Sequence, residues 1–247
     1  MKARLDKLLL IKNLAATRQK AQALIAAGQV MVNQQLVDKA GTMVDEYSTI
    51  EIKETCPYVS RGGYKLGAAL EHFNINPAGY FCLDVGASTG GFTDCLLQNG
   101  AAKVYAVDVG YGQLAWKLRQ DPRVSVMERT NARYLQPGDL QDPLDLAVID
   151  AAFISLKLLI PPLLSLFQKN ISIIALIKPQ FEVGKGKVGK GGVVRDPELH
   201  QEIIDDIIGF CADLGLQSKG VIPSPILGPK GNTEFLLYLV STEEEQK

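Results

Sequence analysis

The pattern of apolar and polar positions divides the chain into a short N-terminal part and a longer C-terminal part. Within residues 5–25 apolar side chains repeat at helical spacing in two runs, and the second run has a helix cap at Thr17 and a stop at Gly28. Alternation at Val30 and Val32, followed by a turn at 33–35, predicts a small pair of strands that reaches 49–52. This part is therefore predicted to be a small α+β unit of two short helices and a hairpin.

Beyond residue 60 short apolar runs alternate with helical segments, which is typical of an α/β fold with a parallel sheet covered on both faces. Strands are predicted at 81–85, 103–108, 124–127, 144–150, 171–177 and 234–240. Helices are predicted at 91–99, at 156–167, and from Pro197, after the N-cap Asp196, to a point before Gly215. The expected organisation is a domain at 1–53, a linker at 54–60, a second domain at 61–242 and a flexible tail at 243–247.

Composition excludes several classes of protein. A hydrophobic fraction of 47 % over 247 residues supplies a real core, so wholesale disorder is excluded. The longest uncharged apolar stretch, 158–167, is interrupted by Pro161 and Pro162 and is too short to span a membrane. Charged residues near the N-terminus interrupt any signal-peptide core. We therefore expect a cytoplasmic protein with no membrane span.

The charge is uneven along the chain. The net charge of -1 provides no global attraction to nucleic acid, but in residues 1–39 basic residues outnumber acidic ones by seven to two. A second basic stretch, 178–195, is rich in glycine. The four cysteines have no CxxC spacing and only two histidines are present, so no metal site is predicted.

A glycine-rich loop follows the first buried strand of the second part. Its candidate cofactor-binding residues are Asp84, Gly86, Ser88, Gly90 and Gly91. Glycines at such a bend let the backbone approach a ligand and leave the N–H groups of the next helix free to bind it. The following strand ends at Asp108, the position at which an acidic side chain meets a ribose diol. The acidic residue beside the loop favours the cationic S-adenosylmethionine over NAD; the alternative is a tight turn without a ligand.

Seven motifs in order extend this picture to almost the whole chain. They are SRGGYKL from Ser60, DVGASTGGFTD from Asp84, VYAVDVGYGQL from Val104, LAVIDAAFISL from Leu146, LIKPQFE from Leu176, GGVVRDP from Gly191 and GPKGNTEFLLYL from Gly228. With the RLDKLL opening, they resemble the TlyA, or haemolysin A, family. The resemblance implies an S4-type RNA-binding domain before an FtsJ-like domain with a Rossmann-like methyltransferase fold and a mostly parallel seven-stranded sheet.

The resemblance also implies a catalytic Lys-Asp-Lys-Glu tetrad. By motif its members are Lys65, Asp150, Lys178 and Glu234. Independently, the pattern places Asp150 and Lys178 at the C-terminal ends of buried strands, where open α/β sheets bind ligands, so Asp150 is also a candidate cofactor contact. Ala152 stands where many relatives have serine, a departure that removes no member of the tetrad.

The chemistry of ribose methylation requires such a set of residues. A ribose hydroxyl is a poor nucleophile and needs a base, and a lysine, with an ordinary pKa of about 10.4, becomes one where desolvation and a second ammonium lower that pKa toward roughly 7 or 8. We expect Lys178 to activate the hydroxyl and Lys65 to hold the ribose or a phosphate. The two carboxylates are expected to orient the lysines.

Basic residues in both parts are candidate contacts to RNA phosphates. They are Arg4, Lys7, Arg18, Lys20, Arg61, Lys185, Lys187 and Lys190. Such contacts supply affinity and register rather than sequence reading. The glycine-rich stretch is expected to close over RNA, with a solubilising loop as the alternative.

The function implied is S-adenosylmethionine-dependent methylation of ribose 2'-hydroxyls in ribosomal RNA, of cytidine as in the family. The expected partner is ribosomal RNA or a ribosomal subunit, and no obligate protein partner is indicated. The alternatives are a haemolysin or pore-forming protein, a nicotinamide-dependent oxidoreductase, and a non-catalytic binding protein for structured RNA. The lack of a long amphipathic run, the non-standard glycine spacing and the intact tetrad argue against these in turn.

Overall fold

The computed structural model describes residues 2–26, 28–52, 56–184, 189 and 191–242. The chain forms two compact units, Met1–Pro57 and Tyr58–Lys247. Residues 58–60, which the sequence pattern assigned to the linker, pack with the second unit. The Val59 N–H donates to Asp94 Oδ2 at 2.7 Å, and the Tyr58 ring lies so close to Gly63 that a Cβ there would overlap it. The tail at 243–247 lies outside the described residues.

The N-terminal unit has two helices and two small antiparallel sheets. Its elements are β1 (Lys2–Arg4), α1 (Leu5–Ile11), α2 (Arg18–Ala26), β2 (Val30–Val32), β3 (Gln35–Leu36), β4 (Met43–Asp45) and β5 (Ile50–Ile52). Strand β1 pairs with β4, and β2 lies between β3 and β5. The apolar positions that repeat at helical spacing form its core, with Leu5, Leu9 and Ile25 fully buried. The predicted cap is present, since Thr17 Oγ1 accepts the Lys20 N–H at 3.1 Å.

The second unit is built on a seven-stranded, mostly parallel sheet, which confirms the predicted fold class. In spatial order its strands are β11 (Leu216–Pro223), β12 (Phe235–Ser241), β10 (Ser172–Ile177), β9 (Leu146–Ile149), β6 (Phe81–Val85), β7 (Lys103–Asp108) and β8 (Val124–Glu128). The strands from β10 to β8 are parallel, and β12 is antiparallel to both of its neighbours. The order of the strands reverses between β6 and β9, where such sheets open a ligand crevice.

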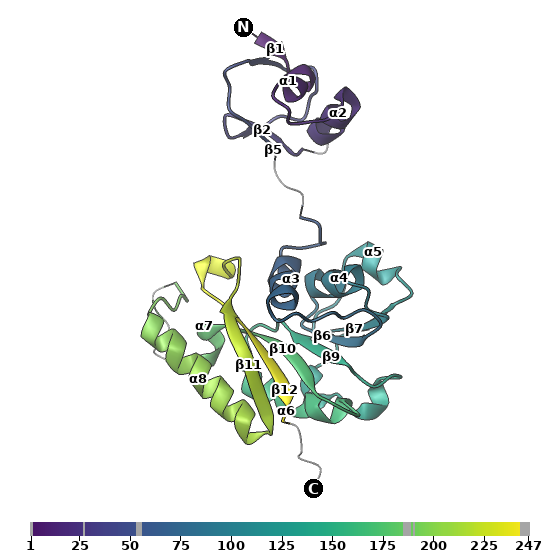
Figure 1. Ribbon diagram of the computed structural model, residues 1–247, viewed down its shortest axis with the longest axis vertical. Helices are drawn as coiled ribbons and strands as arrows, with labels where there is room; N and C mark the ends of the chain where they lie inside the picture. The colour runs from purple at the N-terminus through teal and green to yellow at the C-terminus, as the bar shows by residue number, and fades with distance from the viewer. Residues whose placement is uncertain (1, 27, 53–55, 185–188, 190, 243–247) are drawn as a thin grey trace. The chain divides into compact units, whose positions relative to one another are not determined.

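Helices cover both faces of this sheet (Figure 1). They are α3 (Gly62–His72), α4 (Gly91–Gln98), α5 (Trp116–Arg119), α6 (Leu156–Leu163), α7 (Pro179–Glu182) and α8 (Pro197–Asp213), with 3-10 turns at Ala132–Tyr134, Pro137–Asp139, Leu164–Leu166 and Pro229–Gly231. Alternate strand side chains enter two cores: Leu83 and Ile149 pack with α6 and α8, whereas Cys82 and Val148 pack with α3 and α4. Within the described residues, no helix is long and apolar enough to cross a membrane.

The edge strand β11 is absent from the pattern-based prediction. Its sequence mixes polar and apolar residues, and the pairing with β12 shifts register between Ser218 and Gly220, so its alternation is broken. The helix predicted at 156–167 ends at Leu163 and continues as a 3-10 turn. The predicted N-cap of α8 is present, because Asp196 Oδ1 accepts the Glu198 N–H at 3.0 Å.

Candidate active site

The point at which the strand order reverses brings two loops together. The loop after β6 turns at Gly86, whose φ of 86° favours glycine, and a Cβ there would lie 2.9 Å from the carbonyl oxygen of Asp150. Asp150 follows β9, and its N–H donates to the Val85 carbonyl at 2.9 Å. The glycine loop and Asp150 are therefore neighbours because their strands are neighbours in the sheet.

Four charged side chains from four separate segments meet beside this junction. Lys178, after β10, has its Nζ 2.5 Å from Asp150 Oδ1, and donates to the Asp150 carbonyl oxygen at 3.2 Å. Lys65, on α3, has its Nζ 2.6 Å from Glu234 Oε2 and 3.9 Å from Asp150 Oδ2. Glu234 immediately precedes β12. The structure thus brings all four tetrad candidates into one continuous chain of alternating charges.

Burial makes this chain of charges unusual. Lys65, Lys178 and Glu234 are only 7 %, 8 % and 1 % exposed, and the Asp150 side chain is 20 % exposed. Charges are expensive to bury unless each meets an opposite charge, and here two ammonium groups alternate with two carboxylates. Glu234 also lies against Gly228, where a Cβ would overlap its carboxyl group. The absence of a side chain at Gly228 therefore makes room for the Glu234 carboxylate.

A cavity of about 710 Å³ lies over these groups. Three members of the tetrad line it, namely Lys65, Asp150 and Lys178. The remaining predicted site residues in its lining are Arg61, Gly86, Ser88 and Gly91. Glu234 does not line the cavity, but it contacts Lys65, which does. The cavity therefore has a glycine loop on one side and paired lysines on another.

Asp108, at the end of β7, is held beside the glycine loop. Its Oδ2 accepts the Ser88 N–H at 2.8 Å, and its Oδ1 accepts the Gly110 N–H at 2.7 Å. Each carboxylate oxygen has a second lone pair, so this side chain retains the capacity to accept two hydroxyl donors. Asp108 does not line the cavity, but its hydrogen bond from Ser88 fixes its position beside the glycine loop, which does line the cavity.

Two predicted cofactor contacts, Asp84 and Gly90, lie outside the cavity lining. Asp84 is fully buried. Its Oδ2 accepts the Thr93 N–H at 2.9 Å and the Thr93 Oγ1 hydroxyl at 2.6 Å, so it anchors the first turn of α4. Burial raises the pKa of Asp84 to about 7, against the lowering effect of the bonds from Thr93. Gly90 packs against Leu118, where a Cβ would overlap the leucine side chain.

A clamp formed by Glu182 joins the two loops that carry Asp150 and Lys178, and it was not predicted from the sequence. Glu182, at the end of α7, accepts the Ser155 hydroxyl at 2.5 Å and the Leu156 N–H at 2.8 Å. Burial raises the pKa of this carboxyl group. The available sequence signal was an acidic residue four positions after Lys178.

An aromatic pair beside the site was also missed. Phe153 is 90 % exposed with a φ of 63°, a strained conformation for a bulky residue, and its ring centroid lies 4.9 Å from that of Phe181. Its sequence neighbour Ala152 lines the cavity. The two rings therefore lie close to the cavity on the segments that follow Asp150 and Lys178.

The predicted RNA contacts lie in different environments. Lys7 and Lys20 are exposed, and Arg4 and Arg18 both bind Asp6 in the N-terminal unit. Arg61 lines the cavity of the second unit. Lys185, Lys187 and Lys190 lie outside the described residues.

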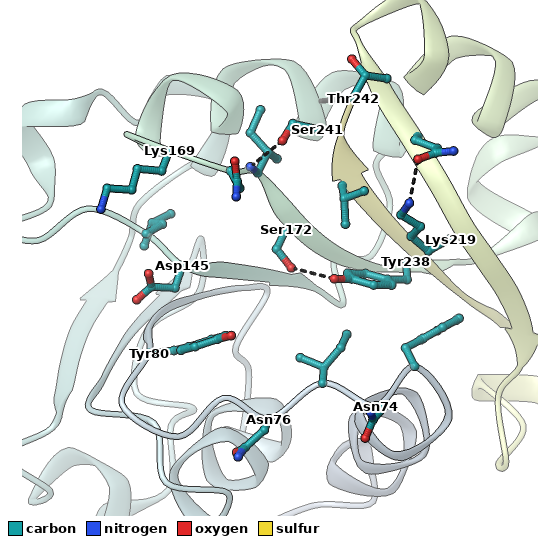
Figure 2. Close-up of a pocket in the computed structure, with 17 residues that line it drawn as sticks. Asn74, Asn76, Tyr80, Asp145, Lys169, Ser172, Lys219, Tyr238, Ser241 and Thr242 are labelled. Carbon is teal, nitrogen blue, oxygen red and sulfur yellow. Dashed lines mark hydrogen bonds between the residues drawn. The ribbon is translucent and has the colours of Figure 1, made fainter. Parts of the chain in front are cut away.

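A second cavity, of about 800 Å³, lies at the opposite end of the sheet (Figure 2). Its lining includes Tyr80, Asp145 and Ser172, which precede or begin parallel strands, and Tyr238, whose hydroxyl accepts that of Ser172 at 3.5 Å. None of the predicted site residues lines it. Among the described residues, no group of three potential metal ligands occurs here or elsewhere.

Comparison with known proteins finds the same two-domain organisation. A model of the FtsJ-like methyltransferase family matches residues 58–241, and a model of the S4 domain matches residues 3–50. The 16S/23S rRNA (cytidine-2'-O)-methyltransferase TlyA of Mycobacterium tuberculosis is 49 % identical over 240 residues, covering 96 % of this chain and 90 % of the relative. Hemolysin A of Brachyspira hyodysenteriae is 40 % identical over 238 residues, covering 96 % of this chain and 99 % of the relative.

A solved structure is similar to this chain over nearly its whole length. One from Streptococcus thermophilus, described as a candidate hemolysin, is 44 % identical with a TM-score of 0.76, covering 98 % of this chain and 90 % of that one. The two domain matches occur in the expected order, and the relatives span nearly the full chain. The chain therefore belongs to the TlyA, or haemolysin A, family, in which an S4 domain precedes an FtsJ-like methyltransferase domain.

Proposed function

We propose that this protein transfers a methyl group from S-adenosylmethionine to the 2'-hydroxyl of a cytidine in ribosomal RNA. The observation that carries the proposal is the buried chain of Lys178, Asp150, Lys65 and Glu234 at the wall of the cavity. The 49 % identical relative named as an rRNA (cytidine-2'-O)-methyltransferase supports the substrate class. A ribosomal substrate would place the protein in the cytoplasm.

The residues around the cavity fit S-adenosylmethionine. This cofactor supplies a methyl group on a sulfonium, which departs as a neutral thioether. The backbone of the glycine loop borders the cavity directly, because Gly86 and Gly91 line it without side chains. Asp108 would accept the two ribose hydroxyls of the cofactor through the lone pairs that Ser88 and Gly110 leave free.

In this proposal Lys178 is the base. After its Nζ has lost a proton to solvent, it would take the proton of the ribose 2'-hydroxyl as that oxygen accepts the methyl group. Asp150 holds that Nζ through two oxygen atoms and stabilises the ammonium that results. Lys65, fixed by Glu234, remains an ammonium and binds the ribose oxygen or a neighbouring phosphate. Positioning supplies most of the acceleration because the leaving group is already good.

The target nucleotide must leave its RNA helix for its ribose to reach this cavity. Phe153 offers an exposed ring, backed by Phe181, on which an unstacked base can pack. The S4 domain and Arg61 would bind surrounding phosphates. The strained backbone at Phe153 is consistent with a ring held outward for this purpose.

The proposal is tested by transfer of labelled methyl from S-adenosylmethionine to ribosomal subunits and to naked rRNA. We expect label in RNA with the wild-type protein, mapped to a cytidine 2'-oxygen, and loss of at least about 100-fold in rate for Lys178→Ala. Lys169→Ala is the matched control, because Lys169 lines the second cavity and should leave the rate unchanged. Equal rates for Lys178→Ala and wild type would overturn the assignment of the base, and no incorporation despite cofactor binding would overturn the activity.

A further inference from the structure

The N-terminal unit contains a buried carboxylate that gathers four donors. Asp6 is 0 % exposed. Its Oδ1 accepts Arg4 Nε at 3.0 Å, and its Oδ2 accepts Arg4 Nη2 at 3.0 Å, Arg18 Nε at 3.0 Å and Gln22 Nε2 at 3.1 Å. Hydrogen bonding from Arg4, with further bonds from Gln22 and Arg18, holds the pKa of Asp6 well below its usual range, although burial opposes this. Asp6 is therefore a carboxylate at any pH suited to RNA.

The two arginines bound to Asp6 keep part of their donor capacity for a ligand. Their side chains are 41 % and 50 % exposed, respectively. Within the described residues, Arg4 Nη1 and both terminal nitrogens of Arg18 make no hydrogen bond. The Arg4 guanidinium lies over Gly41, where a Cβ would be 3.3 Å from Nη1. One carboxylate thus holds both guanidinium groups, and each guanidinium keeps free N–H groups. The two arginines and Asp6 together carry a net charge of about +1.

We propose that Asp6 is a positioning residue that holds Arg4 and Arg18 as a preformed clamp for one phosphodiester of the RNA. The proposal rests on the RNA-binding function proposed above. A guanidinium binds phosphate best through two parallel N–H groups, so its orientation affects affinity as well as its charge. An arginine fixed before binding also loses less side-chain entropy on binding than a free one. The ion pairs therefore serve recognition in addition to folding.

The competing interpretation is that Asp6 merely neutralises the arginines. The two interpretations predict opposite signs for Asp6→Asn, which keeps the shape of the side chain and removes its charge. If charge alone mattered, the variant would bind RNA more tightly, because the unit becomes more positive. If orientation matters, it binds more weakly despite the added positive charge.

The test is a salt titration of the binding of the full chain to naked rRNA, followed by fluorescence anisotropy. We expect Asp6→Asn to weaken binding about tenfold and to flatten the dependence on salt by about one phosphate contact. Asp38→Asn makes the same change of charge at an exposed site of the same unit and should bind as tightly as wild type or more tightly. A thermal unfolding curve of each variant shows whether the N-terminal unit is still folded.

A second variant tests the proposal where Asp6→Asn fails to fold. The double variant Arg4→Lys, Arg18→Lys keeps every charge but replaces each planar guanidinium by a single ammonium group. We expect it to bind rRNA about tenfold more weakly than wild type. Wild-type affinity in this variant, or tighter binding by a folded Asp6→Asn, would overturn the clamp. If the wild-type chain itself fails to bind rRNA, the proposed function fails instead, so the two failures are distinct.

Discussion

Glu234 shows how one side chain determines the state of its neighbours in this site. It is 1 % exposed and holds Lys65 at 2.6 Å, while Lys65 in turn faces Asp150. Removing one member of a buried pair leaves an uncompensated charge, which is costly. Lys65, which lines the cavity, is thus held in place by a residue that does not line it.

Glu234→Gln should lower both stability and methyl transfer. The neutral amide leaves the Lys65 ammonium with only the more distant Asp150 carboxylate, so we expect a loss of about 3 kcal/mol in the free energy of unfolding. We also expect a transfer rate at least about tenfold lower, because Lys65 no longer holds the ribose in place. Urea unfolding and single-turnover transfer measure the two effects. Unchanged transfer in the folded variant would contradict the role given to Lys65.

The buried Asp84 predicts a pH dependence of stability. Its pKa rises from 3.8 to about 7 on folding because the carboxylate is desolvated. Between these values the folded state keeps a proton that the unfolded state has lost. The free energy of unfolding therefore falls as pH rises from about 4 to about 7, by on the order of 4 kcal/mol, and the loss is complete above that window.

Asp84→Asn removes this titration while keeping an oxygen that accepts both Thr93 donors. Relative to wild type, the variant should gain stability steadily as pH is raised from about 4 to about 7, in urea unfolding series at each pH. Asp213→Asn, at an exposed position on α8, should show the wild-type pH dependence. Parallel pH curves for Asp84→Asn and wild type would rule out this explanation.

At the scale of elements, the site depends on loops that follow adjacent parallel strands. Asp150 follows β9, Lys178 follows β10, and Glu182 joins their loops through Ser155 and Leu156. The same carboxylate satisfies a free N–H at the start of α6. Strand pairing therefore sets the approximate separation of the two catalytic candidates, and the Glu182 clamp sets the conformation of the segments that follow them.

Glu182→Ala should reduce kcat about ten- to a hundredfold with little change in KM, because the clamp positions Asp150 and Lys178 without lining the cavity. Glu182→Gln should recover much of this rate, since its amide can accept the Leu156 N–H and donate to Ser155. Steady-state transfer kinetics separate the two constants. Glu198→Ala, at an exposed residue of α8, is the control, and a Glu182→Ala enzyme that changes only KM would refute a positioning role.

At the scale of the whole molecule, the two units have independent hydrophobic cores. The second unit begins at Tyr58 rather than at the first helix. The bond from Val59 to Asp94 and the packing of Tyr58 on Gly63 belong to it. Ser60 and Arg61, which follow directly, line the cavity.

Two fragments test where the second unit starts. A fragment of residues 58–247 should bind S-adenosylmethionine and lose affinity for rRNA, because it lacks the S4 domain. A fragment of residues 62–247 lacks the Tyr58 and Val59 contacts, and its thermal midpoint should be lower by about 4 °C or more. Differential scanning calorimetry of both fragments makes the comparison. Equal midpoints would show that residues 58–61 contribute nothing to the stability of this unit.

The local sequence determined most of the elements of this protein. Strands such as β6 and β7 are short, mostly apolar and mostly buried runs, and α8 has its own cap at Asp196, so their signals are contained in a few neighbouring residues. Family motifs likewise indicated Lys65, Asp150, Lys178 and Glu234 as a set. The edge strand β11 was missed because the bulge near Gly220 breaks its alternation.

Only the tertiary structure decided which of these residues touch. The pairing of Lys65 with Glu234 joins positions 169 apart, and the Glu182 clamp spans two loops. Asp84 binds Thr93 and does not line the cavity. The Asp6 carboxylate on α1 likewise accepts donors from β1 and from α2. Periodicity encodes the face of an element on which a residue lies. The distance between two charges depends on how those elements pack, and no local pattern contains it.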